Sequence, residues 1–233
     1  MVMLDLFIKA GYRFAIAHCN FRLRGNESDA DQDFVKKFAE DRKIRFHTIS
    51  FNTGSYAAER NLSIQMAARE LRYNWFNDIV HEYQYRFVAT GHNSDDSIET
   101  FFINLTRGTG IHGLTGISIK QDKTIRPLLF ASRKYITEYA TENRISFRED
   151  ASNAETKYLR NKIRHHLIPL FERMAPSFRD SMIETIHNLQ ETEGIFNQKI
   201  EQLRKNWIQS DNEQISIDYT GIEKDENKKN HSF

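Results

Sequence analysis

The sequence has few of the features that mark secreted or membrane proteins. It holds a single cysteine, Cys19, so no disulfide can form within the chain, and this predicts a reducing compartment, the cytoplasm. No apolar run approaches the roughly 20 residues that a membrane-spanning helix needs. The apolar N-terminus has no charged segment before it and no small-residue cleavage site, so we interpret it as a core helix and not as a signal peptide. We therefore expect no membrane partner.

An excess of charge of one sign is also absent. The 33 Lys and Arg residues balance 32 Asp and Glu residues, which gives a net charge of +1. The totals therefore neither favour nor exclude nucleic acid as a partner, and a local basic patch would have to provide that role. The hydrophobic content of 39% over 233 residues is enough for one α/β domain with an appendage, or for two small domains.

Helix and strand patterns alternate through the first half of the chain. Helices are predicted over residues 2–10, 29–42 and 63–83, strands over 14–17, 45–51 and 87–89, and a polar loop over 52–61. This alternation is typical of a parallel sheet with helices on both faces, as in Rossmann-like α/β folds.

The second half is mainly helical. The patterns predict an extended stretch over 125–129, a helix over 132–143, a basic helix over 158–166 that stops near Pro169, a long amphipathic helix over 176–209 and a short strand over 215–217.

The most informative stretch follows the strand at 87–89. The chain turns at Gly91 and begins a helix, with Asn93 or Ser94 as the N-cap. Asp96 and Glu99 lie three residues apart and off the apolar face of this helix, so both carboxylates can point into the cleft above the strand end. Open α/β sheets bind their ligands in that cleft. The acids can hold Mg²⁺ between phosphates or position an amine. The alternative is that they only favour the helix dipole.

Further polar residues follow other strand ends. They are His18 and Asn20 after the first strand, Gly91 and His92 after the third, and Asp95 beside the two acids. Each group alone is explained by the polarity of loops, but three groups at one edge of a sheet favour a site. The histidines have no metal-ligand spacing with cysteine or acids, so we reject a structural zinc site. Cys19 lies in or beside a strand and is interpreted as a buried apolar residue.

Arginines occupy loops and element ends. Arg107, beside Gly108 and near Gly110, is the best candidate to meet an anionic substrate, because a guanidinium pairs bidentately with phosphate. The basic helix carries Arg160 and Arg164, which are either a solvated face or an RNA-facing surface beside Asp150-x-Ser152-Asn153. The others in loops or at element ends are Arg24, Arg126 and Arg133.

Taken together, these residues resemble the tRNA(Ile)-lysidine synthases of the PP-loop, or N-type ATP pyrophosphatase, superfamily. The matching blocks cover residues 1–175 in order: His18-x-Asn20-x-x-Leu23-Arg24, Gly91-His92-x-x-Asp95-Asp96-x-x-Glu99-Thr100, Arg107-Gly108-x-Gly110-x-x-Gly113-Leu114, Arg126-Pro127-Leu128-Leu129, Asp150-x-Ser152-Asn153 and Tyr158-x-Arg160-Asn161-x-Ile163-Arg164. The resemblance implies an adenine nucleotide alpha hydrolase-like fold and an ATP-dependent ligase.

The implied reaction adenylates the C2 carbonyl of the wobble cytidine in the CAU anticodon of tRNA(Ile), after which the ε-amine of L-lysine displaces AMP. ATP and Mg²⁺ would be the cofactors, and a homodimer stays open. The resemblance implies catalytic roles for Asp95, Asp96, Glu99 and Arg107. It implies that the nucleotide lies near His18, Asn20, Gly91 and His92. It implies that tRNA contacts Arg24, Arg126, Arg133, Arg160 and Arg164.

The sequence departs from the family pattern, because the Ser-Gly-Gly-x-Asp-Ser loop that cradles pyrophosphate is absent. We interpret the chain as the interior of a lysidine synthase, truncated at both ends, and expect no ATP–pyrophosphate exchange from it as printed. The expected segments are an α/β domain over 1–118, a tRNA-facing completion over 119–175, a helical linker or the start of a C-terminal domain over 176–222, and a disordered tail over 223–233.

Two other functions remain open at this point. A non-catalytic fragment that binds tRNA or a nucleotide is favoured by the missing loop. A different PP-loop enzyme, such as a tRNA thiolase, is disfavoured because such enzymes commonly use cysteines for sulfur transfer, and Cys19 is the only cysteine.

Overall fold

The computed structural model describes residues 1–148, 159–210 and 215–217. The chain forms two compact units. The first unit comprises residues 1–95 and 118–155, and the second unit comprises residues 96–117 and 156–233. Helix α5 (Ser94–Arg107) begins in the first unit and continues in the second. The four segments expected from the sequence stay a prediction, and the residues Asp150, Ser152 and Asn153 and the expected disordered tail lie outside the described residues.

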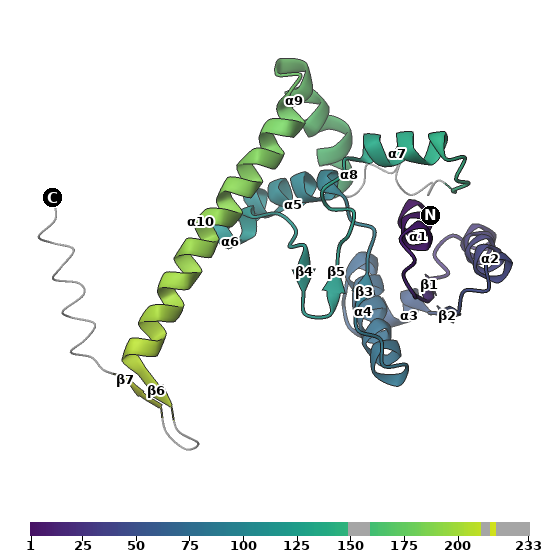
Figure 1. The fold of residues 1–233 in the computed structure, drawn as a ribbon, viewed down its shortest axis with the longest axis horizontal. Helices are drawn as coiled ribbons and strands as arrows, with labels where there is room; N and C mark the ends of the chain where they lie inside the picture. The colour runs from purple at the N-terminus through teal and green to yellow at the C-terminus, as the bar shows by residue number, and fades with distance from the viewer. Residues whose placement is uncertain (149–158, 211–214, 218–233) are drawn as a thin grey trace, which may run out of the picture. The chain divides into compact units, whose positions relative to one another are not determined.

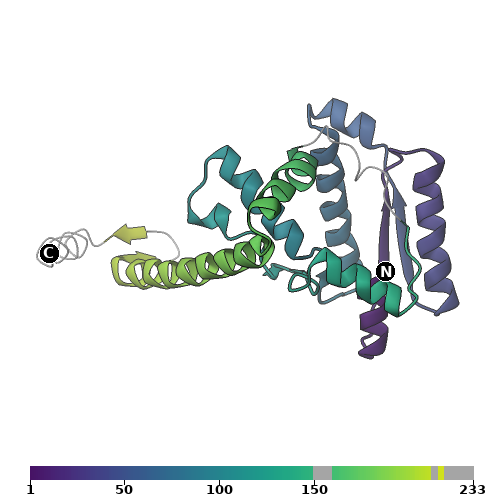
Figure 2. The same cartoon turned by 90° about the horizontal axis from the view of Figure 1, so that it is seen from above.

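The first unit contains a parallel pair of strands. Strands β1 (Ile16–Asn20) and β2 (Phe46–Ser50) pair from Ile16↔Phe46 to Asn20↔Ser50. Helix α2 (Asn26–Asp41) connects them and packs on both, as the purple helix beside the strands in Figure 2 shows. The expected strand over 14–17 is therefore misplaced: His18 and Asn20 belong to the strand and not to a loop, because β2 offers ladder partners up to Ser50.

A second sheet of the same unit has three short strands. Strand β3 (Val88–Ala89) pairs in parallel with β5 (Thr124–Ile125), which pairs in antiparallel with β4 (Lys120–Gln121). The β4–β5 hairpin was not expected from the sequence. Its turn is tight because Asp122 adopts a φ of 50°, a conformation that Asp tolerates better than most residues. The parallel pairings of β1 with β2 and of β3 with β5 are the pattern expected from the alternation of elements.

Helices of the first unit begin directly after residues that cap their N-termini. Ser63 caps α4 (Ile64–Glu82) and Ser132 caps α7 (Arg133–Glu142), each by accepting a bond from a backbone N–H of the first turn. The predicted polar loop over 52–61 is wrong, because Asn52 caps a short helix there, α3 (Thr53–Glu59).

The N-terminal helix is fixed to α7 by polar contacts. Helix α1 (Val2–Lys9) contacts α7, where Asp5 accepts a hydrogen bond of 2.9 Å from the hydroxyl of Tyr139. Lys9 donates to the same hydroxyl at 2.9 Å and to Asn143 at 2.7 Å. The expected helix over 2–10 is confirmed to within one residue.

The second unit is helical around an apolar core. Its further elements are α6 (Ile111–Leu114), α8 (Leu159–Lys162), a π-helical turn (Ile163–Leu167), α9 (Ile168–Met174) and α10 (Phe178–Trp207), the long green helix of Figure 1. Its core residues are Ile98, Phe102, Ile163, Ile168 and Ile186. Gly116 permits a close approach here: its φ is +68°, and an added Cβ would lie 3.2 Å from both Ile186 and Ser97.

The basic helix does not stop at Pro169 as the sequence predicted. Pro169 has no N–H and its ring crowds the carbonyl four residues earlier, so an α-helix cannot run through this position unchanged. The chain instead widens into the π-helical turn over Ile163–Leu167 and resumes as α9, with the proline in its first turn. This local widening positions Arg164.

The described C-terminal end carries a two-stranded ribbon. Strand β6 (Ile208–Ser210) pairs in antiparallel with β7 (Ile215–Ile217), so the short strand expected at 215–217 is confirmed. Within the described part of the chain, none of the helices combines the length and the apolar character that crossing a membrane requires.

Candidate functional site

The turn after β3 is held by short hydrogen bonds within the first unit. The Thr90 hydroxyl and His92 Nδ1 are hydrogen-bonded at 2.9 Å. Asp95 Oδ2 accepts a 2.7 Å hydrogen bond from the backbone N–H of Arg133, the first residue of α7. This carboxylate therefore satisfies a free donor at a helix N-terminus, a stabilising position for a negative charge. Asp95 is thus engaged in the fold, which limits any catalytic role.

The second unit contains an acid–arginine cluster, formed by Asp96, Glu99, Arg160 and Arg164. Arg164 donates two hydrogen bonds to Glu99, from Nε to Oε1 at 2.6 Å and from Nη2 to Oε2 at 3.0 Å. It also lies 3.8 Å from Asp96 Oδ1. Arg160 lies 3.7 Å from Glu99 Oε2 and 3.9 Å from Asp96 Oδ1. The sequence assigned the acids to catalysis and the arginines to tRNA, and the structure brings all four together.

Because Glu99 is buried, its charge interacts strongly with the arginine charges of the cluster. The Glu99 side chain is only 1% exposed, and burial raises the pKa of its carboxyl, while the hydrogen bonds from Arg164 act in the opposite direction. A bidentate guanidinium keeps a buried carboxylate ionised more effectively than a single donor does. The cluster therefore pairs two negative with two positive charges, and its acids are positioned by arginines from outside α5.

The cluster does not resemble a metal site. Both oxygens of Glu99 already accept from Arg164, and Arg160 and Arg164 both lie near Asp96. Among the described residues, no group of three or more His, Cys, Asp or Glu side chains could hold a metal ion. The side chains of this cluster therefore do not fit Mg²⁺ as a resident ion.

Asn20 is part of a buried network in the first unit. It is 2% exposed, and its amide donates to Asp29 at 2.7 Å and to Gln32 at 3.3 Å, while its Oδ1 accepts from the N–H of Arg22. Its polar atoms are thus used within the protein, and Asn20 fixes the loop that follows β1. His18, on the same strand, is partly buried, and burial lowers its pKa, so its imidazole is neutral at pH 7.

Arg24 is tied to acids of helix α2. It donates to Asp31 at 2.7 Å and lies 3.8 Å from Glu27. Arg148 also donates to Asp31, at 2.5 Å. Although burial raises the pKa of Asp31, the hydrogen bonds from Arg148 and Arg24 outweigh it and lower that pKa. Sequence analysis missed Asp31 because nothing local to it signals two arginine partners.

The three remaining arginines of the prediction differ in exposure. Arg107 and Arg133 have exposed side chains, as expected for residues that meet a substrate. Arg126 is only 5% exposed, and its Nη1 donates to the carbonyl of Ser118 at 2.6 Å. Gly91 is exposed at the turn, and an added Cβ there would meet no atom within 4 Å. These positions leave the predicted roles untested.

Cys19 has the environment of an inert thiol. Burial raises its pKa to about 11. The thiolate, which is the reactive form, is therefore rare at neutral pH.

We expect native Cys19 to react with iodoacetamide at pH 8 on the order of 100-fold more slowly than in the unfolded chain, because the unfolded thiol has its ordinary pKa. Mass spectrometry of timed samples, with and without urea, measures both rates. Equal rates would show that the thiol is not protected by burial.

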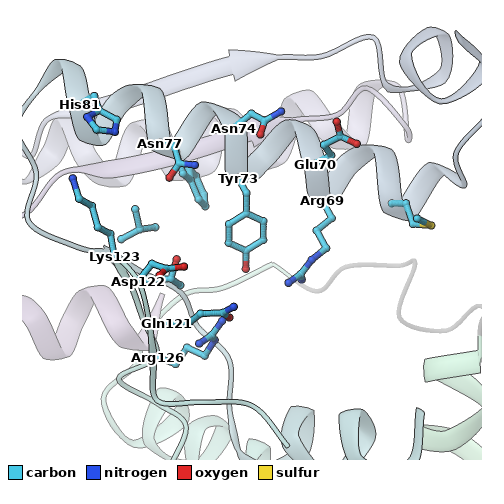
Figure 3. A pocket seen from close by; sticks show the side chains of 14 residues that line it. Arg69, Glu70, Tyr73, Asn74, Asn77, His81, Gln121, Asp122, Lys123 and Arg126 are labelled. Atoms are coloured by element: carbon cyan, nitrogen blue, oxygen red, sulfur yellow. The ribbon is translucent and has the colours of Figure 1, made fainter. Parts of the chain in front are cut away.

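Helix α4 and the β4–β5 hairpin line an open cavity of about 800 Å³ in the first unit (Figure 3). Arg69 and Tyr73 line it from α4, Lys123 lines it from the hairpin turn, and Arg126 lines it from just after β5. Sequence analysis did not single out the first three. The spacing of Arg69 and Tyr73 places them on one helix face, but the sequence gives no sign that a hairpin faces them.

The amino-acid sequence matches a known protein family. The PP-loop domain model matches residues 1–171. The tRNA(Ile)-lysidine synthase of Bacteroides thetaiotaomicron is 44% identical over 204 residues, which are 88% of this chain and 48% of that protein. Those of Porphyromonas gingivalis W83 (44%, 82% of this chain and 42% of that protein) and Chlorobaculum tepidum (39%, 83% and 59%) are also similar. The chain spans about half the length of the curated relatives it matches.

A solved structure confirms the expected fold class. The U34-tRNA thiolase NcsA from Methanococcus maripaludis, solved with its [4Fe-4S] cluster, superposes with a TM-score of 0.65. The match covers 82% of this chain and 67% of that chain at 18% identity. At this identity the likeness concerns the fold alone. The expected resemblance to lysidine synthases is confirmed by the sequence matches.

Proposed function

Because the chain belongs to the PP-loop family, whose members use ATP, we propose that it serves the conversion of the wobble cytidine in the CAU anticodon of tRNA(Ile) to lysidine. One observation carries this proposal: 44% identity to a tRNA(Ile)-lysidine synthase over 88% of the chain. The acid–arginine cluster supports it, because such an arrangement suits a reaction between a cationic amine and an anionic nucleotide.

The proposed reaction has two steps. The C2 oxygen of cytidine attacks the α-phosphorus of ATP, which forms an adenylated tRNA and releases pyrophosphate. The ε-amine of L-lysine then attacks C2, the C2–O bond breaks, and AMP leaves with the oxygen while the amine loses a proton. Adenylation is required because the carbonyl oxygen is a poor leaving group until it carries a phosphate.

The two acids of the cluster have different exposures, so we assign them different tasks. Asp96 is 16% exposed and Glu99 is 1% exposed. The more accessible Asp96 would bind the lysine ammonium and accept its proton as the amine attacks. Glu99 would act as a positioning residue that fixes Arg164. Asp95, which accepts from the N–H of Arg133, would fix the start of α5.

The arginines would bind the phosphates and the RNA. Arg107, exposed at the end of α5, would pair with the phosphate of the adenylate, where charge develops as AMP leaves. Arg160 and Arg164 would combine cluster contacts with binding of the anticodon. Binding of the tRNA backbone is proposed for the arginines of the first unit, namely Arg24, Arg126 and Arg133.

The nucleotide would lie against the turns that follow β1 and β3. The neutral imidazole of His18 suits contact with an uncharged adenine better than a charged one would. Asn20 would act by holding its loop, and Gly91 and His92 would let the chain pass close to the nucleotide. Mg²⁺ is proposed only as the ion that accompanies the ATP phosphates. A homodimer stays a prediction.

The test is lysidine formation. The sequence contains no Ser-Gly-Gly-x-Asp-Ser loop. The assay therefore compares the 233-residue chain with a fusion that carries a strand and this loop before Met1. We expect the fusion to incorporate labelled L-lysine into tRNA(Ile) with a CAU anticodon, only with ATP, and not into a transcript with a GAU anticodon. The printed chain should show no ATP–pyrophosphate exchange. Failure of a folded fusion to modify either transcript would refute the proposal.

A further inference from the structure

The cavity between α4 and the β4–β5 hairpin has a buried positive charge on its wall. Arg126 lines this cavity and is only 5% exposed. Its Nη1 donates to the Ser118 carbonyl, whereas its Nε is buried and has no hydrogen-bond partner in the part of the chain that the structure describes. Among the described residues, no carboxylate pairs with Arg126. A buried guanidinium without a counter-charge is costly, and an anion in the cavity would offset that cost.

Two further cations line the same cavity. Arg69 extends from α4, with its guanidinium 4.8 Å from the ring centre of Tyr73, one helical turn further on. Figure 3 shows the side chains of Arg69 and Tyr73 reaching from the helix toward Gln121 and Arg126. Lys123 adds an exposed ammonium from the hairpin turn. Three cations from two separate segments thus line one cavity, with Arg69 and Arg126 toward one end and Lys123 toward the other (Figure 3).

The acids that line the cavity do not cancel this charge. Glu70 accepts hydrogen bonds from the Tyr56 hydroxyl at 2.7 Å and from Arg60 at 3.0 Å, so a cation already balances it. Asp122, in the hairpin turn, is the other acid that lines the cavity. Among the described residues that line the cavity, Arg69, Lys123 and Arg126 therefore outnumber Asp122, the acid for which no ion pair is found. The hydroxyl of Tyr73 and the amide of Gln121 add neutral donors.

We propose that this cavity is a phosphate-binding site, with Arg126 as its buried base and Arg69 and Lys123 as its rim. A phosphate accepts several hydrogen bonds and pairs with planar guanidinium groups, which matches the donors present. The inference deepens the proposed function, on which it rests: the phosphate belongs either to the RNA backbone or to a free nucleotide. It also explains how Arg126, although buried, can take part in binding.

The test measures binding of the 233-residue chain to a tRNA(Ile) transcript and, separately, to ATP. The double variant Arg69→Gln/Lys123→Gln changes two exposed side chains and should keep the fold. For RNA, we expect a loss of affinity of about tenfold at moderate salt, and a decrease of about 0.7 to 0.9 per cation in the slope of log K against log salt. Lys36→Gln is the matched control, because Lys36 lies on α2 and does not line the cavity.

A third variant examines the base of the site. Arg126→Gln should weaken the same ligand at least as strongly, and circular dichroism shows whether it stays folded. If Arg126→Gln unfolds, the double variant Arg69→Gln/Lys123→Gln still tests the proposed phosphate site. A loss confined to tRNA identifies the RNA backbone as the source of the phosphate, and a loss confined to ATP identifies the nucleotide. Unchanged binding of both ligands by the double variant would overturn the inference.

Failure of this inference can be told apart from failure of the proposed function. If the loop-bearing fusion makes lysidine while the double variant binds tRNA and ATP normally, only the phosphate site is wrong. If binding depends on the cavity but the fusion makes no lysidine, the site stands and the ligase function falls. If the chain binds neither ligand, the phosphate site is refuted.

Discussion

Replacing Arg164 by methionine is expected to lower the free energy of unfolding by about 3 to 5 kcal/mol at pH 7, because it leaves a buried carboxylate without its partner. Glu99 is 1% exposed and receives two hydrogen bonds from Arg164, and methionine keeps the apolar stem but supplies no donor. Urea unfolding followed by far-UV circular dichroism measures the loss.

The loss of stability in Arg164→Met should become smaller as the pH falls. Burial already raises the pKa of Glu99, and removal of Arg164 raises it further above the value in the unfolded chain. A raised pKa favours the protonated form in the folded state, so the penalty is present at neutral pH and diminishes as the pH falls through the raised pKa. The difference between wild type and Arg164→Met should therefore narrow on acidification.

Two controls separate the buried pair from general effects. The double variant Glu99→Gln/Arg164→Met contains no buried charge and should regain part of the lost stability. Arg204→Met breaks a solvent-exposed ion pair, in which Arg204 Nη1 lies 3.1 Å from Glu201 Oε1. This change should lower the free energy of unfolding by less than about 1 kcal/mol. Equal losses in Arg164→Met and Arg204→Met would mean that the cluster contributes no more than a surface pair.

Replacing Arg107 by alanine is expected to lower the rate of lysine incorporation by at least about 100-fold, the cost of removing one donor from a developing anion. The assay uses the loop-bearing fusion with ATP, labelled L-lysine and tRNA(Ile). The fold should be unaffected, because the side chain is exposed and no described residue pairs with it.

Arg107→Lys and Arg133→Ala serve as comparisons. Lysine keeps the charge but not the planar fork, so it should restore only part of the rate. Arg133 is a further exposed arginine, on α7, to which we assign RNA binding, so its loss should raise the tRNA concentration needed and leave the maximal rate nearly unchanged. Near-normal incorporation by Arg107→Ala would show that this residue does not contact the adenylate.

The charge cluster also shows why the sequence assigned its members to separate roles. The sequence predicted Asp96 and Glu99 as carboxylates off the apolar face of α5, since helical periodicity is local. Their partner Arg164 lies 65 residues beyond Glu99, and the π-helical turn that positions it depends on how the chain accommodates Pro169. No local pattern predicts such a pairing. The individual catalytic roles stay predictions.

The sequence alone determined what short-range physics controls. The helices predicted to begin at 63 and 132 do begin there, each behind a serine cap, because a cap satisfies donors within its own first turn. The alternation of strands and helices predicted the parallel pairings, and the motif blocks predicted the family, which the comparisons confirm. These features depend on periodicity and on residues a few positions apart.

Tertiary structure alone decided which distant groups meet. The ladder with β2 extended β1 to Asn20, and the β4–β5 hairpin brought Gln121 and Arg126 to the cavity that Arg69 of α4 also lines. Burial left the guanidinium of Arg126 without a carboxylate partner among the described residues, and it raised the pKa of Cys19 to about 11. Such effects arise from contacts between segments that are far apart in the chain, because desolvation and pairing depend on neighbours in space and not on neighbours in sequence.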